Sequence, residues 1–131
     1  MKIDNTLLDN LTALAQASPR LRMNMDLRNS SADSSQRMLN AIEPGSMVPI
    51  HRHQKTSETV VVLRGRVVEE YYSSAGVLEA SYELAAGGPV WALNIPAGQW
   101  HTLRALESGT VILEMKDGAY EPIGAEDVME R

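Results

Sequence analysis

The chain has 131 residues, contains no cysteine and carries a formal net charge of -5. This length suits one domain whose core needs no disulfides, and without thiols any metal must be held by nitrogen and oxygen ligands. The acidic balance disfavours a general nucleic-acid binder, because contact with phosphates needs a basic surface. No apolar run approaches the roughly 20 residues of a membrane helix, and the N-terminus lacks the apolar core of a signal peptide. We therefore expect a cytoplasmic single domain over residues 1–131 that has no membrane partner.

The first predicted element is an amphipathic helix at about residues 6–17. Asn5 and Thr6 offer capping oxygens, and Pro19 ends the pattern. The apolar stripe follows helical spacing: Leu7, Leu8, Leu11, Leu14 and Ala15. The stretch SPRLRMNMDLR is then expected to be extended, and the serine-rich stretch after it to be a loop.

From Gln36 onward the pattern is that of an all-β protein. Alternating or β-branched runs are separated by turn residues at intervals of about 8 to 12. These runs are QRMLNAIEPG, ETVVVLRGRVVEEYY, VLEASYELAAGG, PVWALNIPAG and TVILEMKDGAY. A glycine, Gly65, interrupts the second run where a hairpin could turn. We expect a sandwich or barrel over about residues 20–122, followed by a frayed polar tail at 123–131.

The stretch GSMVPIHRHQKTSETVVVLRG contains two of the three histidines. His51 and His53 alternate along a strand, so their side chains point to the same face. Four residues separate His53 from Glu58, a length suited to a short turn into an antiparallel strand that places Glu58 beside the imidazoles. These groups suit a divalent first-row metal, but histidine pairs also occur on ordinary strand surfaces. Spacing alone leaves both interpretations open.

The third histidine, His101, follows a turn signal in IPAGQWHTL and precedes another alternating run. A third imidazole would complete the ligand set if the fold brought it to the same place.

The chain resembles the cupin superfamily in both of its motifs. The first, G-x5-H-x-H-x4-E-x6-G, is matched at every defined position by Gly45, His51, His53, Glu58 and Gly65. The second, G-x5-P-x-G-x2-H-x3-N, is matched in its centre by Pro96, Gly98 and His101. It departs at both ends, because Gly88 lies too far from Pro96 and Ala105 stands where the motif has asparagine.

Most of residues 18–122 also looks like the WbuC family of cupin-fold metalloproteins. This resemblance implies a jelly-roll barrel, or double-stranded β-helix, with a short N-terminal helix. It implies one divalent transition metal (Fe, Mn, Ni or Zn) held by His51, His53, Glu58 and His101. WbuC-type proteins are found among genes for bacterial surface-polysaccharide synthesis, and small cupins commonly form homodimers.

Other polar residues are candidates for contact with a small-molecule substrate. Arg20 and Arg22 alternate on the expected extended segment, where they could bind a carboxylate or phosphate, although two solvated arginines would give the same pattern. Polar side chains on expected strands would need a partner or a ligand if they faced inward. The substrate-binding set is Arg20, Arg22, Gln36, Lys116 and Tyr120, and no catalytic residue is assigned.

Three functions fit these expectations. The first is a metal-dependent enzyme of the cupin type, an isomerase or a dioxygenase, acting on a sugar or sugar-nucleotide. The second is a metal-containing binding or sensor module without turnover. The third, metal-free epimerase chemistry, is disfavoured because it leaves the complete ligand set without a purpose.

Overall fold

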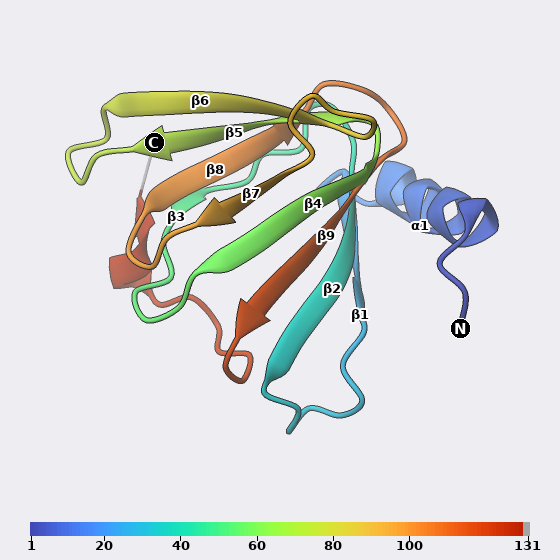
Figure 1. Cartoon of the computed structure of the whole chain (residues 1–131), viewed down its shortest axis with the longest axis horizontal. Coiled ribbons are helices and arrows are strands. Elements are labelled where there is room, and N and C mark those ends of the chain that lie inside the picture. Colours follow the sequence, from blue (N-terminus) through green and yellow to red (C-terminus); the bar gives the residue numbers. More distant parts are fainter. Residues whose placement is uncertain (130–131) are drawn as a thin grey trace.

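The structure is a computed structural model that describes residues 1–129. Two five-stranded antiparallel sheets face each other, and one helix lies outside them (Figure 1). The elements of the first sheet, in spatial order, are β1 (Arg22–Asp26), β2 (Ser35–Ile42), β9 (Thr110–Asp117), β4 (Glu58–Arg64) and β7 (Ala92–Ile95). Those of the second are β10 (Val128–Met129), β3 (Ile50–His51), β8 (Trp100–Ala105), β5 (Arg66–Tyr72) and β6 (Leu78–Ala85). The fold is therefore the expected all-β jelly roll with an N-terminal helix.

Gly65 connects the two sheets and does not turn a hairpin, contrary to the prediction. The strands on either side of it, β4 and β5, belong to different sheets and do not pair with each other. Its φ is +84°, and a Cβ placed there would lie 2.8 Å from the Cα of Thr110. Only glycine fits this crossing without displacing backbone.

The helix α1 (Asn5–Ala17) covers the outer face of the first sheet. It starts one residue earlier than expected, and its N-cap is Asp4, whose Oδ1 accepts a hydrogen bond from the Leu7 amide at 3.0 Å. Leu14, which the pattern assigned to the buried stripe, is 55% exposed. The apolar cluster between helix and sheet consists of Leu8, Leu11, Ala15, Leu39, Ala41 and Val111.

The main core lies between the two sheets. Alternate residues of each strand point inward, so the cluster draws on both sheets. Its fully enclosed members include Ile42, Val60, Val67, Leu84 and Ile112. These side chains fill one end of the barrel, and the polar cavity described below occupies the other.

The segment expected as a frayed polar tail lies on the barrel as far as the structure describes it. A 3-10 turn, η1 (Ala125–Asp127), leads into β10, which pairs with β3. Arg52 binds Asp127 through its Nε at 2.9 Å, and its guanidinium carbon lies 4.6 Å from the Trp100 ring centroid. Residues 130–131 of the expected tail lie outside the described residues. Within residues 1–129, no helix is long and apolar enough to cross a membrane.

Candidate metal centre

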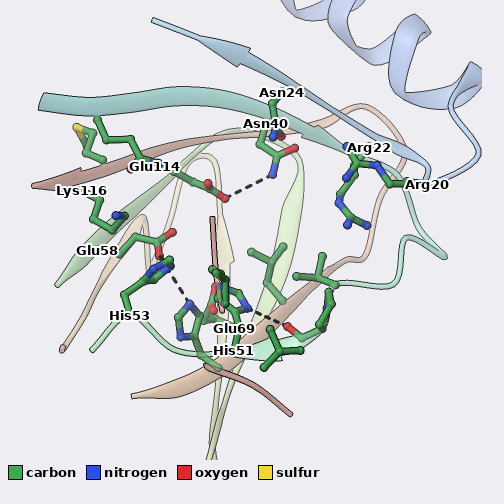
Figure 2. A pocket seen from close by; sticks show the side chains of 18 residues that line it. Arg20, Arg22, Asn24, Asn40, His51, His53, Glu58, Glu69, Glu114 and Lys116 are labelled. Atoms are coloured by element: carbon green, nitrogen blue, oxygen red, sulfur yellow. Dashed lines mark hydrogen bonds and ion pairs between the residues drawn. The ribbon is translucent and has the colours of Figure 1, made fainter. Parts of the chain in front are cut away.

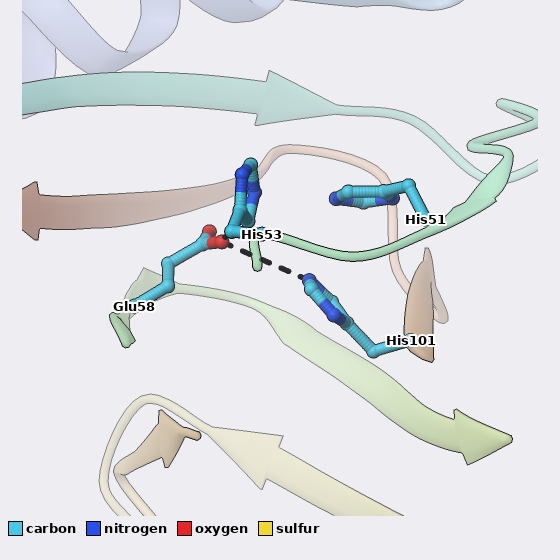
Figure 3. A group of neighbouring side chains, drawn as sticks. All are labelled: His51, His53, Glu58 and His101. Atoms are coloured by element: carbon cyan, nitrogen blue, oxygen red, sulfur yellow. Dashed lines mark ion pairs between the residues drawn. The ribbon is translucent and has the colours of Figure 1, made fainter. Parts of the chain in front are cut away.

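The two sheets bring the three histidines and Glu58 together. His51 ends β3 and is directly paired with His101 near the start of β8, while His53 follows in the loop after β3. Glu58 begins β4 in the other sheet. The expected antiparallel pairing of the histidine strand with the Glu58 strand is therefore wrong. The carboxylate reaches the imidazoles across the gap between sheets (Figure 3).

Each of the four residues offers a ligand atom, and these atoms lie within 4.8 Å of one another. Oε2 of Glu58 is 3.2 Å from Nε2 of His53 and 3.7 Å from Nε2 of His101. The rings of His51 and His101 have centroids 4.4 Å apart. The four donors surround a common point, as ligands of one ion do.

Backbone carbonyls set the orientation of two imidazoles. Nδ1 of His51 lies 2.8 Å from the Pro49 carbonyl oxygen, and Nδ1 of His101 lies 2.9 Å from that of Gln99. A carbonyl oxygen only accepts, so in each ring Nδ1 carries the proton. The Nε2 lone pair of the neutral ring then points to the other ligands, which is the tautomer that a metal requires.

The electrostatics of the site favour a neutral His51 and an ionised Glu58. Burial lowers the pKa of His51 to about 4, and the nearby His101 adds to this effect. Burial alone raises the pKa of Glu58, but the imidazoles of His101 and His53 outweigh it and hold that pKa below its usual range.

The donor set fits a divalent cation. Oε2 of Glu58 is buried and has no hydrogen-bond partner among the described residues, although two imidazole nitrogens face it. With Nδ1 protonated on His101, a lone pair and a carboxylate oxygen oppose each other, an arrangement that a cation between them would stabilise.

The four ligand candidates line a cavity of about 350 Å³ between the sheets (Figure 2). Four of the five expected substrate-binding residues also line it: Arg20, Arg22, Gln36 and Lys116. Arg20 does so from a turn, since β1 begins only at Arg22 and Leu21 between them has a φ of 55°.

Tyr120 does not reach this cavity. The chain leaves β9 at Asp117 and turns at Gly118, whose φ is +96°. Tyr120 is 54% exposed and lines a separate surface hollow beside Arg28. The structure therefore gives no support to its assignment as a ligand contact.

Two further glutamates in the cavity did not enter the predicted site. Glu69, in the middle of β5, is fully buried, and both of its carboxyl oxygens lack hydrogen-bond partners. Glu114 on β9 has a pKa raised to about 8, mainly by burial and then by the charge of Glu58. Strand alternation in VVEEYY points one of two glutamates, Glu69 or Glu70, into the barrel. The sequence therefore indicates a buried glutamate on this strand but does not indicate which of the two it is.

Comparison with solved structures places the chain among cupin-fold proteins. CapF, a capsular polysaccharide assembling protein from Staphylococcus aureus, superposes with a TM-score of 0.69 at 18% identity, over 86% of this chain and 32% of its own. Oxalate oxidase with the substrate analogue glycolate gives 0.65 at 18% identity, over 83% and 57% of the chains. KdgF from Halomonas sp. gives 0.63 at 14% identity, over 79% and 84%. The chain thus spans only about a third of CapF.

Sequence comparisons add a family to this fold. No curated protein matches the chain. One family model matches residues 3–84, which includes His51, His53 and Glu58 but not His101. Since that model covers more than half of the sequence, the chain belongs to the family described as a domain of unknown function, DUF6016, and it has a cupin fold.

Proposed function

We propose that the chain is a metal-dependent cupin enzyme that acts on a sugar or sugar-nucleotide in bacterial surface-polysaccharide metabolism. The proposal of a metal rests on one observation: three imidazoles and one carboxylate converge at the wall of a cavity that is large enough for a small molecule. The resemblance to the WbuC family and the likeness to CapF support the metabolic setting.

His51, His53, Glu58 and His101 would hold one divalent ion, Fe, Mn, Ni or Zn. Four protein ligands leave two positions of an octahedral ion for ligand atoms, and such an ion polarises oxygen groups as a Lewis acid. The protein orients two of the imidazoles through the carbonyls of Pro49 and Gln99. The apolar barrel end behind the cavity keeps bulk water away from the buried side of the site.

The metal proposal is tested by element analysis of anaerobically purified protein. We expect close to one transition metal per wild-type chain and a sharp loss in His51→Ala and Glu58→Ala, with the fold retained by circular dichroism. Glu79→Ala is the matched control, because Glu79 lies exposed on β6. Equal metal content in wild type and in both site variants would contradict the four-ligand site.

The alternative is a metal-containing binding or sensor module. A screen of nucleotide sugars and of simple keto and hydroxy acids separates it from an enzyme. An enzyme shows product formation that is lost in His101→Ala, whereas a sensor shows saturable binding without product.

A homodimer and a cytoplasmic location complete the proposal. The edge strand β6 presents Leu78 and Tyr82, which are 49% and 39% exposed, and such an edge can pair across a two-fold axis. Light scattering should give twice the chain mass, and a monomeric mass would reject the dimer.

A further inference from the structure

The cavity gathers the unpartnered buried polar atoms of the described residues. These atoms are Oε1 of Gln36, Oδ1 of Asn40, Oε2 of Glu58 and both carboxyl oxygens of Glu69. All four residues line the same cavity. Buried polar atoms are nearly always paired in folded proteins, so five exceptions in one place indicate that a ligand provides the partners. Every one of these atoms is an oxygen that accepts hydrogen bonds.

Glu69 is the strongest of these indications. Its side chain is 0% exposed, it is not one of the candidate metal ligands, and no cation is paired with it. Its two carboxyl oxygens are free to accept hydrogen bonds from the hydroxyl groups of a ligand.

The opposite side of the cavity carries positive charge. Nη1 of Arg22 donates to Oγ of Ser46 at 3.2 Å and to the carbonyl of Met47 at 3.1 Å. Oγ of Ser46 in turn donates to the Arg20 carbonyl at 2.7 Å, which fixes the turn that carries both arginines. Figure 2 shows the pair across the cavity from Lys116.

The two arginines are close together without an acidic partner. Burial lowers the pKa of Arg22, and the charge of Arg20 lowers it further. No ion pair within residues 1–129 involves Arg20, Arg22 or Lys116. Neighbouring guanidinium groups with free donors are suited to a carboxylate or a phosphate.

We infer that the cavity takes a polyhydroxylated ring bearing an anionic group, with its hydroxyls at Glu69 and Asn40 and its anion between Arg20 and Arg22. This inference rests on the proposed function, since the ligand shares the cavity with the metal, and it narrows the substrate to an acidic or phosphorylated sugar. A volume of about 350 Å³ lies at the small end of ligand pockets and is large enough for one substituted sugar ring.

Isothermal titration of the zinc-loaded and the metal-free protein tests this ligand class. The probes are D-glucuronate, D-glucose 1-phosphate, neutral D-glucose and acetate, which has the charge without the hydroxyls. We expect either acidic sugar to bind at least tenfold more tightly than both D-glucose and acetate. The tighter of the two acidic sugars identifies the anion as carboxylate or phosphate.

Variants assign the two parts of the subsite. The double variant Arg20→Gln with Arg22→Gln should lose the preference for acidic sugars over D-glucose, while Arg104→Gln, at an exposed position, should keep it. Glu69→Leu should lose the preference for D-glucuronate over acetate, while Glu70→Gln, one position along β5, should not.

The outcomes separate this inference from the metal proposal. If folded, zinc-loaded protein binds no acidic sugar, or binds D-glucose equally well, the ligand class is wrong although the metal site stands. A preference that survives in the double arginine variant means that the anion binds the metal, which also overturns the inference. If no zinc binds at all, the metal proposal fails, and the titration of metal-free protein still decides the arginine subsite.

Discussion

The same strands form both ends of the barrel, but the side chains that point inward differ between the two ends. On β9, Ile112 faces inward within the apolar cluster, while Glu114 and Lys116 line the cavity further along. On β8, Ala105 likewise lies in the apolar core, while His101, further toward the other end, lines the cavity. One end buries hydrocarbon and stabilises the fold, whereas the other buries unpaired polar atoms, which cost free energy until a cation or ligand satisfies them. Stability and binding are thus separated along the barrel axis.

The largest effect is expected at the apolar end. Ile112→Ala removes a fully buried side chain and should lower the free energy of unfolding by roughly 2–5 kcal/mol. Urea unfolding of metal-free protein measures this loss. Ile3→Ala is the matched control, since Ile3 is 43% exposed. A loss below about 1 kcal/mol at Ile112 would mean that this end does not dominate stability.

A substitution at the polar end should have the opposite sign. Glu69→Leu replaces an unpartnered buried carboxyl with an apolar side chain of similar size, so the metal-free protein should gain about 1–3 kcal/mol. Thermal and urea unfolding should agree on this gain, and Glu70→Leu should not reproduce it. A clear destabilisation would show that Glu69 has a structural partner in solution.

The polar end should also make stability depend on pH. Glu114 has a pKa of about 8 in the folded protein, above its value in the unfolded chain, so the folded state retains a proton that the unfolded state has lost. Stability from this group is therefore lost as pH rises toward 8, by about 1 kcal/mol per pH unit between pH 6.5 and 7.5. His51, with a pKa of about 4, is neutral throughout this window.

The measurement is urea unfolding of metal-free protein at several pH values. Glu114→Gln should reduce the slope relative to wild type. An unchanged slope in that variant would assign the pH dependence to another group.

The smallest effect is expected where the C-terminal segment closes the polar end. Arg52→Gln removes the contacts with Asp127 and Trp100, which should cost less than about 1 kcal/mol. Hydrogen exchange should quicken at the backbone amide of position 52, which donates to the Asp127 carbonyl at 3.0 Å. Unchanged exchange there would show that the side chain does not hold this segment.

Strand alternation allowed much of the fold to be predicted. The period-two runs located the strands, and the cupin motifs indicated the jelly roll that the structure has. Alternation is a local property, however, and it does not say which sheet a strand joins. The local pattern therefore predicts a hairpin turn at Gly65, although the strands on either side of it join different sheets and its close contact with Thr110 requires glycine there.

The same limit applies to the site. His51 and His53 could be placed on one face because only local geometry was needed, and the motifs indicated Glu58 and His101. Glu69 and Glu70 are adjacent in β5, and each face of this strand carries the same series of residues, valine, glutamate and tyrosine. The local pattern therefore does not identify which glutamate faces inward. The position of Tyr120 depends on where the chain turns after β9, and the turn at Gly118, which strand alternation does not predict, keeps Tyr120 out of the cavity.

The position of β3 has a consequence for how the site is made. This short strand carries His51, and its neighbours in the sheet are β8 and β10, both from the last third of the sequence. During synthesis the first two imidazoles therefore leave the ribosome long before the strands that fix their geometry. The four-ligand set is therefore complete only after His101 has emerged, and the sheet around β3 is complete only after residues 100–129 have emerged.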